Sequence, residues 1–219
     1  MRAGVITFPG SNCDRDVAVA LAAAGAKVER LWHADTELPA LDLIVLPGGF
    51  AYGDYLRCGA IAAHAPIMNE VMRRAAAGVA VLGICNGFQI LTEVRLLPGA
   101  LISNQGLSFV CRPVELEVAS TDSVFTAGFA PGQIIRLPVA HHDGMYVCDA
   151  DDLRRLEDED RIAFRYRDNP NDSVRDIAGV LGRGRNVLGV MPHPERASDP
   201  MLGGEDGRIL FRSLLEGLG

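Results

Sequence analysis

Short apolar runs that stop at proline or glycine constrain the fold of this chain more than any other feature. Residues 3–8, 43–46 and 79–83 are such runs, and each leads directly into a glycine-containing turn. Runs of this length, apolar at nearly every position, indicate strands that are buried on both faces of a sheet. The sequence therefore predicts a sheet that is covered on both sides.

Helical segments lie between these runs. Residues 17–24 are rich in alanine and leucine, follow a polar stretch at 12–16 that can cap a helix, and stop at Gly25. Further helices are predicted over residues 60–77 and 88–94, and residues 27–32 form another strand candidate. Strands that alternate with helices predict the α/β class, with a doubly wound, mostly parallel sheet flanked by helices.

The second half of the chain follows a different pattern. Its strand candidates are not separated by helices, so antiparallel additions to the sheet are expected. We interpret the acidic, arginine-containing stretch 149–160 as a solvated surface segment. With no internal repeat and no low-complexity linker, residues 1–219 are expected to form one domain. The remaining predicted elements are strands at 109–118, 134–140 and 162–166, a hairpin of 177–181 with 187–191, and a closing helix at 205–216.

Composition excludes several classes of function. Hydrophobic residues make up 48% of the chain, which is enough for a sizeable core. A formal net charge of −7 argues against a nucleic-acid backbone or an anionic membrane surface as the main partner. No stretch approaches the roughly 20 apolar residues of a membrane span, and the first residues do not resemble a signal peptide.

The cysteines favour a reducing compartment. There are five of them, widely spaced and without a Cys-x-x-Cys pair, so neither a disulfide framework nor a structural metal site is expected. We therefore expect a soluble, cytoplasmic protein with no metal of its own.

One cysteine stands where a nucleophile is expected. Cys85 lies in Gly83-Ile84-Cys85-Asn86-Gly87, between a predicted strand and a predicted helix. The attacking species is the thiolate, which the positive end of a helix and a nearby imidazolium both favour. Glycines at 83 and 87 suit a sharp turn in which side chains would clash. The alternative is a buried structural cysteine in a glycine-flanked turn.

The imidazole partner is expected to be His193. It lies in Met191-Pro192-His193-Pro194-Glu195, after an apolar strand, where the flanking prolines favour extended backbone. Residues two apart in an extended segment point the same way, so Glu195 can orient the His193 ring. A simple surface turn is the alternative for this motif.

Backbone N–H groups complete the predicted site. Acyl transfer develops an oxyanion, which the N–H groups of Gly49 and Asn86 are placed to hold. Gly49 follows the strand that should neighbour the one carrying Cys85, and Asn86 is the residue after the nucleophile. A tight turn without catalytic role remains the alternative for Gly48-Gly49.

These elements, in this order, resemble the class I (triad) glutamine amidotransferase family, which implies its flavodoxin-like fold. The resemblance spans nearly the whole chain and is strongest to a branch of glutaminase subunits that supply ammonia to a separate purine-biosynthetic synthetase. It is carried by residues 8–14, 47–60, 83–89, 109–112, 176–179 and 191–197.

The resemblance implies roles for particular residues. Cys85 would be the nucleophile, His193 the general base and acid, and Glu195 its orienter, with L-glutamine as substrate. Gln89 would contact the amino-acid end of the substrate; a buried helix residue bonded to its own backbone is the alternative. The chain departs from the family at 141–144, where His-His-Asp-Gly replaces the usual His-Gly-Glu-Gly.

The chain shows no nucleotide-binding motif. Neither a Gly-x-x-x-x-Gly-Lys-Ser/Thr loop nor a Gly-x-Gly-x-x-Gly turn after a strand is present. ATP and magnesium are therefore expected on a synthetase subunit, and the resemblance adds a small accessory subunit as a second partner. Two other functions were weighed: a free-standing cysteine hydrolase or peptidase of related architecture, and a binding module that has lost catalysis.

Overall fold

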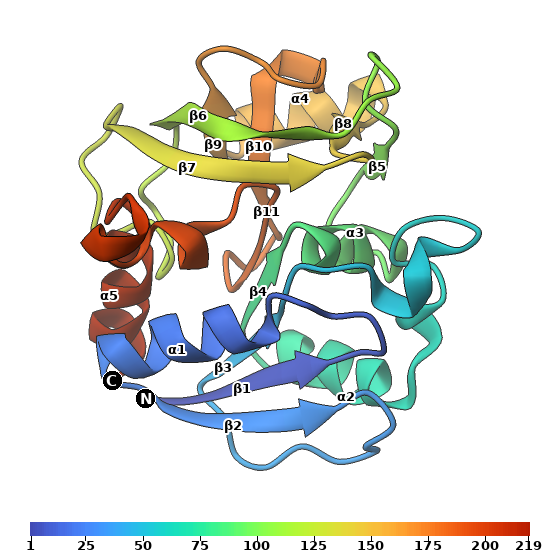
Figure 1. The fold of residues 1–219 in the computed structure, drawn as a ribbon, viewed down its shortest axis with the longest axis vertical. Helices are drawn as coiled ribbons and strands as arrows, with labels where there is room; N and C mark the ends of the chain where they lie inside the picture. The colour runs from blue at the N-terminus through green and yellow to red at the C-terminus, as the bar shows by residue number, and fades with distance from the viewer.

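The computed structural model describes residues 1–219, with the side chain of Leu202 excepted. One nine-stranded sheet runs through the molecule in the order β2-β1-β3-β4-β11-β10-β9-β6-β7 (Figure 1). Its first five strands are parallel to one another. They are β2 (Lys27–Trp32), β1 (Arg2–Thr7), β3 (Leu43–Leu46), β4 (Ala80–Ile84) and β11 (Val187–Val190).

The other half of the sheet is antiparallel, as predicted from the strands that follow one another without helices. A separate antiparallel pair is formed by β5 (Ala100–Ile102) and β8 (Met145–Val147). The fold class is thereby confirmed. The strands of the antiparallel half are β10 (Ile177–Leu181), β9 (Ile162–Tyr166), β6 (Val110–Val118) and β7 (Ile134–His141).

Helices cover both faces of the parallel strands. Figure 1 shows α1 in front of these strands and α2 behind them, while α5 packs against α1. None of the helices in the described part of the chain is long and apolar enough to cross a membrane. The five α-helices are α1 (Asp14–Ala24), α2 (Pro66–Ala76), α3 (Asn86–Glu93), α4 (Ala150–Asp158) and α5 (Gly207–Leu218).

The helix predicted over residues 60–77 begins later than expected. In the structure α2 starts at Pro66, and the residues before it form turns and the short 3₁₀ helix η2 (Ala62–His64). Proline lacks an N–H and clashes with the preceding turn inside a helix, but it suits the first helical position. Pro66 therefore marks the start of the helix rather than its middle.

The stretch 149–160 contains a helix that the sequence interpretation did not include. Asp149 caps α4 by accepting a hydrogen bond from the Asp152 N–H at 2.7 Å, and Leu156 is fully buried beneath it. Most other positions of α4 are charged or exposed, which gave the segment its polar character. One buried leucine and a cap are enough to dock a short surface helix.

The parallel strands bring distant parts of the sequence to one edge of the sheet. β3 and β4 are direct neighbours, as predicted, and β11 pairs with the other side of β4. In parallel strands the carboxyl ends meet at the same edge, where α/β proteins place their ligands. The segments that follow β1, β3, β4 and β11 therefore converge there.

Candidate active site

Cys85 occupies a strained turn between β4 and α3. Its backbone has φ 51° and ψ −105°, a conformation that costs a non-glycine residue free energy. A Cβ on Gly83 would lie 2.7 Å from the backbone of Gly87, and a Cβ on Gly87 would overlap the Leu46 carbonyl oxygen. The glycines are therefore required for space, as the sequence predicts, and they hold the thiol at the amino end of α3.

The thiol of Cys85 is enclosed by the protein. The residue is 5% exposed, and its Sγ lies 3.7 Å from the Ala140 carbonyl oxygen near the end of β7. The antiparallel half of the sheet thus forms one wall of the site.

His193 and Glu195 form a buried pair after β11. His193 Nδ1 and Glu195 Oε1 are 2.6 Å apart, and the two side chains are 2% and 0% exposed. The backbone at His193 is extended, and its N–H donates to the Pro138 carbonyl oxygen at 2.8 Å. The structure therefore places the carboxylate where it fixes the orientation of the imidazole ring.

Electrostatics at this pair favour the imidazolium. Burial alone would lower the pKa of His193, but the charges of Glu195 and Cys85 outweigh it and raise the pKa well above its ordinary value. A protonated His193 stabilises a thiolate on Cys85 and can deliver its proton to a leaving nitrogen.

The turn Gly48-Gly49 lies between the His193 ring and Cys85. A Cβ on Gly48 would lie 2.7 Å from His193 Cε1 and 3.4 Å from Cys85 Cβ, so the ring and the thiol-bearing carbon flank one small gap. Gly49 has φ 144°, which favours glycine. Sequence reasoning selected Gly49 and missed the spatial requirement at Gly48.

The predicted oxyanion donors have free N–H groups. Within the described residues, the backbone N–H groups of Gly49 and Asn86 have no hydrogen-bond acceptor. Asn86 lies in the first turn of α3, where helical N–H groups are unpaired. Both groups are therefore available for an oxyanion next to the thiol.

The Gln89 side chain is held by other protein groups. Its Oε1 accepts a hydrogen bond from Asn86 Nδ2 at 2.8 Å, and its Nε2 donates to the Asp143 carbonyl oxygen at 2.6 Å. Gln89 thus connects the elbow, the strand–turn–helix segment 83–87 that carries Cys85, to the turn after β7. It does not bond its own backbone through the side chain, and contact with the substrate stays a prediction.

Asp143, in the segment that departs from the family pattern, joins two loops. Its Oδ2 accepts a hydrogen bond from the Cys58 thiol at 3.2 Å, and its Oδ1 accepts one from the Ser103 hydroxyl. Burial raises the pKa of Asp143, but these hydrogen bonds outweigh it and lower the pKa. The shorter acid at this position is therefore fully engaged within the protein.

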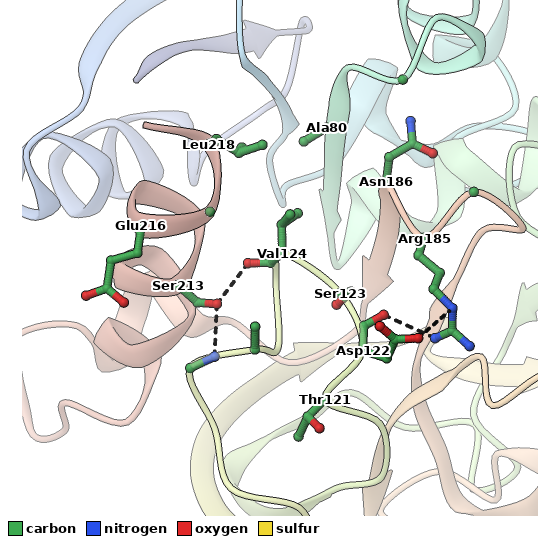
Figure 2. A pocket seen from close by; sticks show the side chains of 15 residues that line it. Ala80, Thr121, Asp122, Ser123, Val124, Arg185, Asn186, Ser213, Glu216 and Leu218 are labelled. Atoms are coloured by element: carbon green, nitrogen blue, oxygen red, sulfur yellow. Dashed lines mark hydrogen bonds and ion pairs between the residues drawn. The ribbon is translucent and has the colours of Figure 1, made fainter.

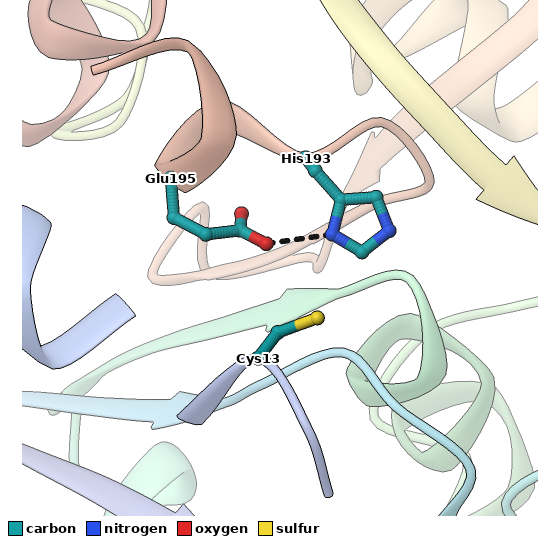
Figure 3. Close-up of side chains that lie close together, drawn as sticks. All are labelled: Cys13, His193 and Glu195. Atoms are coloured by element: carbon teal, nitrogen blue, oxygen red, sulfur yellow. Dashed lines mark hydrogen bonds and ion pairs between the residues drawn. The ribbon is translucent and has the colours of Figure 1, made fainter. Parts of the chain in front are cut away.

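Cys13 is a second thiol beside His193. Its Sγ, a ring nitrogen of His193 and a carboxylate oxygen of Glu195 all lie within 4.8 Å of one another (Figure 3). This is the only such group of possible metal ligands among the described side chains. Arg196 Nη2 donates to the Cys13 sulfur at 3.0 Å. A guanidinium at that position opposes the binding of a cation by these three side chains.

Two cavities lie outside the turn that carries Cys85. Figure 2 shows a cavity of about 600 Å³ between α5 and the segments 121–128 and 184–186. Ala80, at the start of β4, is on its wall, whereas Cys85 follows the end of that strand. A second cavity of about 720 Å³ lies between α1 and α5, with Glu195 and Arg196 on its wall. Neither cavity is lined by Cys85.

Comparison with known proteins identifies the family of the chain. The CobB/CobQ-like glutamine amidotransferase domain matches residues 1–203. A protein of Cereibacter sphaeroides named phosphoribosylformylglycinamidine synthase subunit PurQ is 60% identical over 100% of this chain and 99% of its own length. The protein of the same name from Rubrobacter xylanophilus is 56% identical over 99% of both chains.

Solved structures agree with the sequence relatives. A chain of the PurLQS structure from Thermotoga maritima has a TM-score of 0.93 and 45% identity, covering 100% of this chain and 99% of its own. A glutamine amidotransferase of the same organism shares the fold, with a TM-score of 0.64 and 18% identity over 100% and 97% of the two chains. The chain therefore belongs to the CobB/CobQ-like glutamine amidotransferase family and, within it, to the PurQ subunits of phosphoribosylformylglycinamidine synthase.

Proposed function

We propose that this chain hydrolyses L-glutamine to glutamate and ammonia through Cys85, His193 and Glu195, and that the ammonia is used by a separate synthetase subunit. The observation that carries the proposal is the strained elbow that presents Cys85 across the Gly48 gap from the His193–Glu195 pair. A nucleophile from the turn after β4, and a base and an orienting carboxylate from the segment after β11, form the arrangement that amide hydrolysis requires.

The first half of the reaction forms a thioester. The Cys85 thiolate attacks the side-chain carbonyl carbon of glutamine, and the N–H groups of Gly49 and Asn86 hold the resulting oxyanion. His193 gives its proton to the nitrogen as the carbon–nitrogen bond breaks, which releases ammonia. The Glu195 carboxylate, 2.6 Å from His193 Nδ1, keeps the ring in place.

The second half releases glutamate. His193, now neutral, removes a proton from a water molecule that attacks the thioester carbonyl, and the carbon–sulfur bond breaks. Cys85 leaves as the thiolate that began the cycle. We propose Gln89 as the contact for the amino-acid end of glutamine, with Asn86 keeping its side chain in position.

The destination of the ammonia lies on other subunits. The relatives are named as one subunit of phosphoribosylformylglycinamidine synthase, and the solved neighbour is named PurLQS. We propose that this chain binds a large synthetase subunit and a small accessory subunit of that enzyme. The synthetase would use ATP and magnesium to convert formylglycinamide ribonucleotide to the amidine. Such a complex would operate in the cytoplasm, with residues 1–219 acting as one domain.

Exposed apolar side chains favour a partner near the mouth of the site. Tyr55 and Leu56 on one loop, and Leu107 and Phe109 on another, are at least half exposed. The two loops are joined through the Asp143 carboxylate. Apolar groups gathered around a catalytic entrance are typical of a protein interface. This observation favours a subunit of a complex over a free-standing hydrolase.

Glutamate release with and without the synthetase tests the proposal. The isolated chain should hydrolyse glutamine slowly, and the rate should rise at least about tenfold when the synthetase is added with its ligands, because partner contacts order the loops that Asp143 joins. The measurement is glutamate formed per minute at saturating glutamine. Strong hydrolysis by the isolated chain that the synthetase does not increase would favour the free-standing hydrolase.

A further inference from the structure

The Asn86 side chain, directly after the nucleophile, makes contacts beyond the one with Gln89 that the mechanism uses. The residue is 1% exposed. Its Oδ1 accepts a hydrogen bond from the Ala51 N–H at 3.1 Å. Its Nδ2 donates to Asp54 Oδ1 at 3.1 Å and to Gln89 Oε1 at 2.8 Å. A carboxamide that is buried and bonded through both of its polar atoms is held in one position.

The partners determine which way the Asn86 carboxamide points. The backbone N–H of Ala51 can only donate, so it must face the oxygen Oδ1. Nδ2 then faces two oxygen atoms, one on Asp54 and one on Gln89. Gln89 is fixed in turn, because its Nε2 donates to the Asp143 carbonyl oxygen at 2.6 Å, which can only accept. A carboxylate in place of the Asn86 carboxamide would therefore set acceptors against acceptors.

Two of these hydrogen bonds connect the elbow to the segment that carries Gly49. Beyond the paired ends of β3 and β4, and within the described residues, the hydrogen bonds between residues 48–54 and 84–87 are those of the Asn86 side chain. The N–H of Phe50, next along the chain from Gly49, donates to the loop after β1 instead. The Asn86 side chain is therefore the hydrogen-bonded link between the two predicted oxyanion donors.

The segment that follows Gly49 has a strained backbone. Tyr52, Asp54 and Leu56 have φ of 55°, 54° and 73°, in the left-handed region that residues other than glycine rarely adopt. A segment in this conformation relaxes where its surroundings do not hold it. Two hydrogen bonds from Asn86 reach the segment, one directly before its first strained residue and one at its second. Their loss should let the segment move relative to the elbow.

We propose that the Asn86 side chain is a positioning residue that holds the N–H groups of Gly49 and Asn86 at the spacing an oxyanion requires. Donors stabilise an oxyanion when they are already in place, roughly 3 Å from it, as the charge develops. The Asn86 N–H is fixed by α3, whereas the Gly49 N–H lies next to a strained segment and depends on the link. The carboxamide faces protein groups, so it acts through the position of Gly49. This inference rests on the proposed function.

Two reactions of Cys85 separate this role from a structural one. Glutamine hydrolysis develops an oxyanion, whereas alkylation by iodoacetamide displaces iodide from a saturated carbon and develops none. Both reactions need an intact elbow and a thiolate. In the complex with the synthetase, kcat is measured at saturating glutamine, and alkylation of the peptide that contains Cys85 is followed by mass spectrometry. Saturating glutamine is used because a weaker substrate contact through Gln89 changes KM and leaves kcat.

Asn86→Ala removes all three hydrogen bonds and should lower kcat about a hundredfold, the loss that one missing oxyanion donor causes. The rate constant of Cys85 alkylation should stay within about twofold. Asn186→Ala, at a residue labelled in Figure 2, is the matched control. The Asn186 carboxamide donates to the carbonyl oxygens of Ala75 and Val79 at 2.8 and 2.9 Å, at the opposite end of β4. The control variant should keep both rates.

An exchange of two side chains provides the test if Asn86→Ala does not fold. Asn86→Asp keeps an acceptor for the Ala51 N–H but sets a second carboxylate against Asp54, so kcat should fall. Adding Asp54→Asn restores a donor between the two side chains. The double variant should have a kcat at least about fivefold above that of Asn86→Asp alone, because the link between the segments is restored.

Other outcomes would overturn the role of the Asn86 side chain. A kcat of Asn86→Ala within about threefold of the unaltered complex would show that the carboxamide does not position the donors. Equal losses of kcat and of the Cys85 alkylation rate would show that it supports the elbow itself. If the unaltered complex forms no glutamate although Cys85 is alkylated, the proposed function is contradicted, and this inference with it.

Discussion

Replacing Cys85 by alanine should reduce glutamate release to the level seen without enzyme, a loss of at least about a thousandfold. The sulfur is the atom that bonds to the substrate carbonyl in the proposed mechanism, so its removal eliminates the thioester intermediate. The Gly49 and Asn86 N–H groups would remain, but they stabilise an oxyanion that no longer forms efficiently. The measurement is glutamate formed by the complex with its synthetase, where the rate is highest.

A second thiol provides the control for this prediction. Cys13 lies within 4.8 Å of the His193 and Glu195 polar atoms, so it is a rival nucleophile by position. Its sulfur accepts a hydrogen bond from Arg196, and the residue directly precedes α1 with φ −104°, without the positive φ of Cys85. Cys13→Ala should therefore lose no more than about tenfold, and Cys111→Ala, on an exposed position, should lose nothing. Full activity of Cys85→Ala would refute the mechanism.

Replacing His193 by asparagine should lower the rate of hydrolysis by about a thousandfold or more. Asparagine can still reach Glu195 from the position of Nδ1, but it can neither take the proton of a water molecule nor give one to the leaving nitrogen. Steady-state kcat and kcat/KM should both fall, since acylation and hydrolysis each need the imidazole. His64→Asn, on an exposed residue outside the site, is the control.

The pH dependence separates the role of Glu195 from that of His193. The pKa of His193 is raised, so the imidazolium that accompanies the thiolate persists above its ordinary range and is lost only as pH rises through the raised value. Glu195→Gln removes the charge that contributes to this shift. The alkaline limb of kcat/KM should therefore move to lower pH. If the alkaline limb of kcat/KM stays at the same pH in Glu195→Gln, Glu195 does not stabilise the charge on His193.

Much of the site could be predicted because its residues carry local signals. Gly83 and Gly87 reveal the elbow since only a sharp turn needs glycine on both sides of a cysteine, and the structure shows the clash that side chains would cause. The motif around His193 likewise predicts its pairing with Glu195, although the extended backbone stops at His193 and Glu195 lies in the 3₁₀ helix η4 (Pro194–Ala197). These features depend on residues close in sequence.

Other features depend on the order of strands, which local patterns do not reveal. Cys13 follows β1, two strands away from β4, and reaches His193 only because β11 pairs with the far side of β4. The Ala140 carbonyl oxygen lies 3.7 Å from the Cys85 sulfur because the antiparallel half of the sheet packs against this side of the thiol. Sequence periodicity indicates where such strands occur, but it does not indicate which strands pair with one another in the sheet.

The start of α2 and the existence of α4 show a second limit. Residues 60–65 have helical composition, yet Pro66 is the residue that determines where the helix begins. In α4 most residues are charged, so the sequence pattern does not reveal that Leu156 is buried and attaches the helix to the core. In both cases one residue outweighs the average character of the segment.

Covalent labelling tests the central claim most directly, because two thiols lie beside one histidine. The chain would be treated with a glutamine analogue that carries an electrophilic ketone in place of the amide, and the modified peptide identified by mass spectrometry. We expect a single adduct on Cys85, since only that thiol stands on the elbow within reach of the oxyanion donors. An adduct found chiefly on Cys13 or Cys58 would contradict the assignment of the nucleophile.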